Sequence, residues 1–188
     1  MNFNRHLELR DRHAILSPSK YYWSNYDDDR LLAFFRSQMA VARGTELHDF
    51  ACRCIRLKIS LPKSTATLNR YVNDALGFMM IPEQPLFYSD NCFGTADAIA
   101  YDEKEKRLRI HDLKTGTVPA SIQQLYIYAA LFCLEYKVQP DSIRTELRIY
   151  QNDDIIKEKA DPVQIGDIMN RIVRFDLLLE KAKAQVAE

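Results

Sequence analysis

At 188 residues, the chain is long enough for one domain with a sizeable core, and 47% of its residues are hydrophobic, a normal share for a globular protein. No apolar run reaches the length of a membrane span, and the N-terminal residues lack the pattern of a signal peptide. The formal net charge is zero, which excludes a broadly basic surface. Any contact with a polyanion must therefore come from local basic patches.

The first half of the chain predicts two helices and a strand. Residues 1–29 predict irregular structure, and the acidic run that ends it favours a helix start, because negative charge there complements the helix dipole. The expected elements are a helix over Arg30–Lys58, a helix over Thr67–Met80 and a strand over Glu83–Tyr88.

A β-hairpin is predicted next, with strands at Gly94–Tyr101 and Arg107–Lys114 around a charged turn. If the turn closes with Asp102 opposite Arg107, then Asp97 lies opposite Asp112, and directly opposed residues have Cβ atoms about 5 Å apart. Side-chain alternation places both carboxylates at the end of an otherwise apolar face.

The second half of the chain completes an α/β pattern. We expect a loop over 115–119, a helix over Ser121–Tyr136, a strand over Thr145–Gln151 and a closing helix over Asp161–Ala187. This order predicts one domain over residues 1–188, with a mixed β-sheet flanked by helices. It contains no phosphate-binding loop of the ATPase type, so no motor segment is expected.

Two carboxylates and a lysine should meet at this hairpin. Neighbouring buried carboxylates repel each other, so either one is protonated or a cation neutralises both. Oxygen ligands suit Mg²⁺ or Mn²⁺, and Lys114, two residues after Asp112, would point into the same site, where it would orient a water or stabilise charge on a phosphate. The alternative is a surface ion pair between Asp112 and Lys114, with Asp97 facing solvent.

Gln124 and Tyr128 are four residues apart and therefore share one face of the predicted helix. Two interpretations remain open for this pair. The amide and the phenol would contact a DNA phosphate or base, or they would satisfy each other on a partly buried helix.

Taken in order, the motifs Gly44-x-x-x-His48, Gly94-x-x-Asp97, Asp112-x-Lys114 and Gln124-x-x-x-Tyr128 resemble those of the RecB-like branch of the PD-(D/E)XK nuclease superfamily. The match covers roughly residues 40–130. The resemblance implies a restriction-endonuclease-like core that binds Mg²⁺ or Mn²⁺. It implies a catalytic group of four residues: His48, Asp97, Asp112 and Lys114.

The same resemblance implies the ligand set and the DNA-facing residues. His48, Asp97 and Asp112 would hold the metal with the backbone carbonyl of Leu113, and Gln124 and Tyr128 would face DNA. Two other acidic residues lie close to these motifs in the sequence. Glu46 lies about 200° around the helix from His48 and is disfavoured, and Glu83 is expected only in a supporting role.

The expected function is a stand-alone DNA nuclease, with exonuclease action in recombination, repair or replication implied by the resemblance, in a bacterial or phage context. The alternatives are a non-cleaving protein that binds DNA or a partner, and a structure-specific endonuclease. DNA would meet local patches, which are Arg53, Arg56, Lys58 and Lys63, or Lys20 with Tyr21, Tyr22 and Trp23. Partners from a recombination system are also expected.

The four cysteines predict neither a zinc site nor a disulfide framework. They are Cys52, Cys54, Cys92 and Cys133. Some relatives in the resembled family bind an iron–sulfur cluster through clustered downstream cysteines, which this chain lacks, so no cluster is expected. Reduced thiols in a cytoplasmic protein are the simplest interpretation.

Overall fold

The computed structural model describes residues 14, 16 and 18–186, and the chain divides into two compact units, Met1–Arg43 and Gly44–Glu188. The first unit holds a 3₁₀ helix, η2 (Pro18–Asn25), where irregular structure was predicted. Helix α1 (Asp28–Arg56) begins in the first unit and ends in the second. The carboxylate of Asp27 accepts a hydrogen bond from the Arg30 backbone at 2.8 Å, which explains why α1 begins two residues earlier than predicted.

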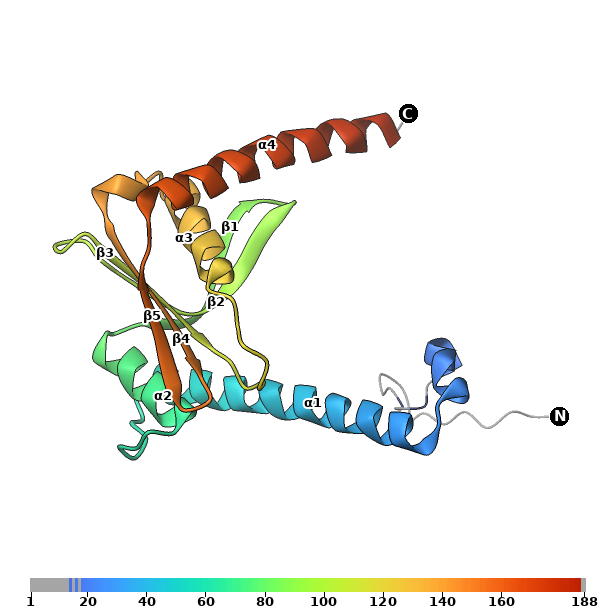
Figure 1. The fold of residues 1–188 in the computed structure, drawn as a ribbon. Helices are drawn as coiled ribbons and strands as arrows, with labels where there is room; N and C mark the ends of the chain where they lie inside the picture. The colour runs from blue at the N-terminus through green and yellow to red at the C-terminus, as the bar shows by residue number, and fades with distance from the viewer. Residues whose placement is uncertain (1–13, 15, 17, 187–188) are drawn as a thin grey trace, which may run out of the picture. The chain divides into compact units, whose positions relative to one another are not determined.

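The second unit is an α/β fold built on a five-stranded mixed sheet, as the sequence predicts (Figure 1). The strands lie in chain order across the sheet, and only β3 and β4 are parallel to each other. Their bounds are β1 (Ile81–Ser89), β2 (Cys92–Asp102), β3 (Arg107–Leu113), β4 (Arg144–Gln151) and β5 (Asp154–Lys159). Strand β5 was not predicted.

Helices cover both faces of this sheet (Figure 1). On one face, α3 (Gln123–Glu135) and α4 (Pro162–Val186) pack on a core that includes Leu108, Ile110 and Leu147, with the short 3₁₀ helix η3 (Pro140–Ser142) nearby. On the other face, α2 (Thr67–Gly77) and the C-terminal part of α1 pack on a second cluster that includes Ala98, Leu113 and Tyr150. No helix in the described ranges is long and apolar enough to cross a membrane.

The β2–β3 hairpin has the predicted register, because Asp102 pairs with Arg107 across the charged turn. The same register places Asp97 across from Asp112, at the end of the hairpin that is far from the turn. Asp97 lies in the middle of β2, and Asp112 is the residue before the last one of β3.

Candidate metal and catalytic site

Asp97 and Asp112 lie in a poorly solvated environment. Asp112 is 2% exposed, and the Asp97 side chain is 19% exposed. Burial first, and then the charge of Asp112, raise the pKa of Asp97 to about 6, against a lowering hydrogen bond from the Leu113 backbone at 2.9 Å. The two carboxylates are therefore close enough to interact electrostatically, as the register predicts.

The side chains of His48 and Glu83 converge beside Asp97. His48, from α1, has its Nδ1 3.5 Å from the Asp97 Oδ2. One ligand atom each from His48, Glu83 and Asp97 lies within 4.8 Å of the other two, a spacing that allows all three to hold one metal ion. The group joins α1, β1 and β2.

Glu83 reaches this group through an unusual backbone conformation. Residues on both sides of it pair with β2 in one continuous register, in which Glu83 would oppose Asp97. Its φ is 51°, in the left-handed region that a residue with a side chain adopts at a cost of about 1–3 kcal/mol. Such strain persists only where surrounding structure holds it in place, and here it accompanies a carboxylate placed beside His48 and Asp97.

The negative charge at this site also affects the pKa of a tyrosine on the α2 side of the sheet. The hydroxyl of Tyr71 is buried, and its pKa is raised first by burial and then by the charges of Asp97, Glu83 and Asp112. The carboxylates therefore act on groups beyond the motif residues. No sequence motif singled out Tyr71, whose position follows from the packing of α2.

Lys114 lies at the boundary between this group and helix α3. Its Nζ donates a hydrogen bond to the Asp112 Oδ1 at 3.0 Å and lies 2.9 Å from the Oδ2. The Oδ2 contact lacks hydrogen-bond geometry, so this buried oxygen accepts no hydrogen bond from any residue that the structure describes. The ion pair considered as an alternative is formed, but Asp97 does not face solvent.

Gln124 and Tyr128 complete a chain of hydrogen bonds that starts at Lys114. The Lys114 Nζ donates to the Gln124 Oε1 at 3.0 Å, and the Gln124 Nε2 donates to the Tyr128 hydroxyl at 3.2 Å. The hydroxyl donates to the Thr95 backbone carbonyl at 2.7 Å. Burial raises the pKa of Tyr128, so its hydroxyl remains protonated.

Two motif glycines allow close packing at this site. A Cβ on Gly44 would lie 2.7 Å from the Thr115 Oγ1, next to Lys114 in the chain. A Cβ on Gly94 would lie 3.1 Å from the ring of Tyr128. The absence of a side chain at Gly94 therefore lets the motif residue Tyr128 approach, and its absence at Gly44 makes room for Thr115, the neighbour of Lys114.

The structure thus brings the predicted residues together in two adjoining sets. His48 and Asp97 meet Glu83, for which only a supporting role was expected, and Asp112 lies with Lys114 and the α3 residues. The backbone amide of Leu113 donates to Asp97, and Glu46 is exposed. The metal, catalytic and DNA-binding roles stay predictions.

Other features fall outside this constellation. The candidate DNA patch at the end of α1 is exposed, whereas the side chains of Lys20 and Tyr21 lie outside the described part of the chain. All four cysteines are free thiols in the described ranges.

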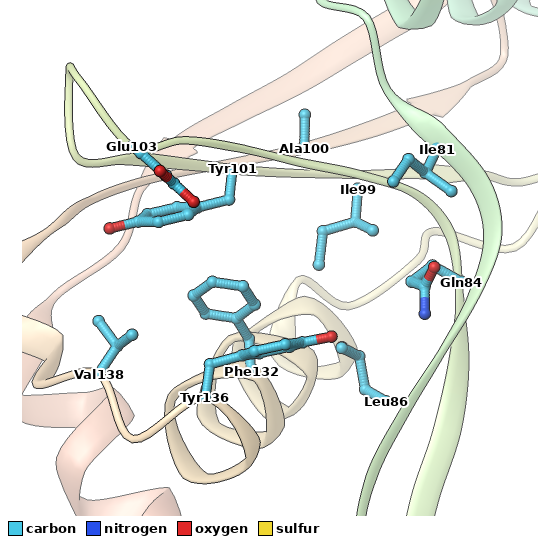
Figure 2. A pocket seen from close by; sticks show the side chains of 10 residues that line it. All are labelled: Ile81, Gln84, Leu86, Ile99, Ala100, Tyr101, Glu103, Phe132, Tyr136 and Val138. Carbon is cyan, nitrogen blue, oxygen red and sulfur yellow. The ribbon is translucent and has the colours of Figure 1, made fainter.

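An apolar cavity of about 440 Å³ lies at the C-terminal end of α3 and contains none of the predicted site residues. Figure 2 shows its lining, which includes Tyr101, Phe132 and Tyr136.

Neither a protein-family model nor a curated protein matches this sequence. The resemblance to the RecB-like nucleases therefore depends on the four sequence motifs.

Proposed function

We propose that this chain is a metal-dependent deoxyribonuclease similar to the RecB-like branch of the PD-(D/E)XK superfamily. The observation that carries the proposal is the convergence of His48, Glu83 and Asp97 beside the Asp112–Lys114 pair. An imidazole nitrogen, two carboxylates and an adjoining buried carboxylate with a lysine form a constellation that phosphodiester hydrolysis can use.

The donor set fits a divalent metal ion. Carboxylate oxygens with one imidazole suit Mn²⁺, and carboxylates with water suit Mg²⁺. The Oδ2 of Asp112 supports the fit, because this buried carboxylate oxygen accepts no hydrogen bond and its charge partner is the Lys114 ammonium, 2.9 Å away. When bound, the metal would polarise the phosphodiester and lower the pKa of a water molecule.

The chain's own residues supply positioning and charge. Asp97 and Asp112 provide oxygens from two neighbouring strands, and His48 and Glu83 close the group from α1 and β1. The ammonium of Lys114 stabilises the negative charge that develops on the phosphate oxygens, an effect that is strongest in a poorly solvated site. Leu113 fixes the Asp97 carboxylate through its backbone amide.

By the same resemblance, we propose exonuclease action on DNA ends in recombination, repair or replication, with protein partners of such a system. The four free cysteines are compatible with a reducing cytoplasm, in a bacterial or phage-infected cell. Exposed Arg53, Arg56 and Lys58 provide a local basic patch for the DNA backbone, which a chain of zero net charge requires.

The test is digestion of end-labelled linear DNA by the purified chain with Mn²⁺ or Mg²⁺, compared with Lys114→Met and Asp112→Asn. We expect wild-type cleavage and a loss of at least about 100-fold in either variant. Circular DNA should resist an exonuclease, and its cleavage would identify an endonuclease.

A matched control separates the loss of the site lysine from a general effect of replacing a lysine. Lys104→Met, in the charged turn at the other end of the hairpin, should cleave like the wild type. Equal activity of wild type and both site variants would contradict the proposal. DNA binding without cleavage by the wild type would instead support the non-cleaving alternative.

A further inference from the structure

The hydrogen-bonded chain from Lys114 to Thr95 suggests a role for α3 that differs from the DNA-facing role implied by the resemblance. We propose that Gln124 and Tyr128 are positioning residues, which form a strut that holds the Lys114 ammonium in place. The inference rests on the proposed function, because it assigns to both residues a task within that site.

Each member of the strut has a fixed donor or acceptor role. The ammonium has only protons to give, so it must face the carbonyl oxygen of the Gln124 amide, which directs the amide nitrogen toward Tyr128. The phenol oxygen accepts the hydrogen bond from the Gln124 amide. The phenol O–H in turn donates a hydrogen bond to the Thr95 carbonyl. A reversed amide would place its NH₂ group against the ammonium, so the network selects one orientation.

The far end of the strut is anchored in the sheet. The Tyr128 ring packs against the core cluster beneath α3, and its edge passes closely over the Cα of Gly94, where a Cβ would lie 3.1 Å away. Thr95, the next residue in β2, supplies the acceptor. The phenol is thereby tied to the strand that carries Asp97.

A strut is useful because lysine is otherwise a flexible side chain. Ordering a lysine costs up to about 2 kcal/mol of rotamer entropy, and two anchors 2.9–3.0 Å from its Nζ provide the compensating contacts. One anchor is Asp112, a proposed metal ligand whose oxygens have a second use. Gln124 is the neutral anchor, which serves the lysine alone.

The strut also leaves little for DNA to bind. The Tyr128 proton and the Gln124 oxygen are both used within the protein. Gln124 is exposed, but its bonds to Lys114 and Tyr128 leave only one amide hydrogen and one oxygen lone pair for DNA. Loss of the strut should therefore slow the reaction rather than weaken DNA binding.

The kinetic test compares Gln124→Leu and Tyr128→Phe with the wild type in Mn²⁺, and measures DNA affinity in Ca²⁺. Because a misplacement of about 1 Å can lower a rate by about 100-fold, we expect kcat to fall by about 10- to 100-fold in Gln124→Leu. KM and the Ca²⁺ affinity should change by less than about 2-fold. Gln124→Glu, which keeps an acceptor for the ammonium, should recover most of the rate.

Gln123→Leu is the matched control, because Gln123 is an exposed neighbour on the same helix whose amide bonds only to Gln164 among the described contacts. It should behave like the wild type. A weaker DNA affinity with unchanged kcat in Gln124→Leu would identify a DNA contact and overturn the strut.

A second readout needs no activity. In the metal-free protein, the Lys114 ammonium should give an ordered ¹⁵N NMR signal in the wild type and in Gln123→Leu, and lose it in Gln124→Leu. An unchanged signal in Gln124→Leu overturns the inference. If the wild type cleaves no DNA, the proposed function fails, and the NMR comparison still decides whether the strut exists.

Discussion

At the scale of single residues, Asp97 is an acid whose surroundings oppose its ionisation. Its pKa is about 6 in the folded, metal-free protein, against 3.8 as the ordinary value. The folded state therefore binds a proton more tightly than the unfolded state. By linkage, the metal-free protein loses stability as the pH rises from about 4 to about 6, and the loss is complete above that range.

Because ionisation of Asp97 destabilises the folded protein, Asp97→Asn should stabilise the metal-free protein at neutral pH. Asparagine keeps an acceptor for the Leu113 amide and removes the buried charge. A rise of the Asp97 pKa from 3.8 to about 6 corresponds to at most about 3 kcal/mol, so we expect a gain of about 1–3 kcal/mol. Urea unfolding with a chelator at pH 7 measures it, and the gain should vanish near pH 4. A loss of stability at pH 7 would contradict this account.

Gly44 illustrates how a missing side chain positions a neighbouring loop. In the middle of α1, Gly44→Ala should gain about 1 kcal/mol of helix propensity. The new Cβ would collide with the Thr115 Oγ1, and Thr115 is exposed and can move. The free energy of unfolding should therefore change by less than about 1 kcal/mol, while displacement of the residue next to Lys114 lowers cleavage about 10-fold.

A second substitution separates this collision from other effects of alanine. Adding Thr115→Ala to Gly44→Ala removes the obstructing oxygen and should restore cleavage. Gly166→Ala, in α4, meets nothing within 4 Å and should only stabilise the protein. If the double variant stays as slow as Gly44→Ala, Thr115 is not the obstacle.

At the scale of elements, the β4–β5 hairpin was only half predicted. Its first strand follows from alternating residues, whereas β5 is short and mostly exposed, so it lacks a clear apolar face. The signal lay in the turn, where Asn152 and Asp153 both adopt positive φ, of 50° and 57°. This is a two-residue hairpin turn of a type that asparagine and aspartate tolerate.

The same turn caps helix α2 from a distance, which predicts a graded set of substitutions. The Asp153 Oδ1 accepts from the Thr67 backbone at 2.7 Å, and the Thr67 hydroxyl accepts from the Asp153 backbone at 2.7 Å. Asp153→Ala removes the cap, which should lower the free energy of unfolding by about 1 kcal/mol. It also places alanine at positive φ, which should lower it by at least about 1 kcal/mol more.

Asp153→Asn keeps both features and should cost less than about 0.5 kcal/mol, and Asp153→Gly, which loses only the cap, should lie between them. Thermal and urea unfolding give the order. Equal stability of the alanine and glycine variants would show that the backbone strain at this turn is negligible.

At the scale of the whole molecule, the sequence predicts what depends on periodicity and misses what depends on tertiary contacts. The register of Asp97 against Asp112 follows from the length of one charged turn, and the helices follow from their apolar spacing. Glu83 could not be placed in this way, because a left-handed residue inside a strand has no periodic signature. The strut likewise depends on how α3 docks on β2, which no spacing within one motif reveals.

Metal binding should join four elements of the fold, because the proposed ligands come from α1, β1, β2 and β3. A ligand that binds only the folded state stabilises it by about 2.7 kcal/mol at 100 times its Kd, so the melting temperature should rise with Mn²⁺ concentration. His48→Ala and Glu83→Gln should lose most of this rise, since each removes one of three converging ligands. Glu46→Gln, an exposed position on the same helix, is the control and should keep it.

A full rise in melting temperature with Mn²⁺ in Glu83→Gln would exclude Glu83 from the ligand set. A loss in Asp112→Asn would then place the metal between Asp97 and Asp112.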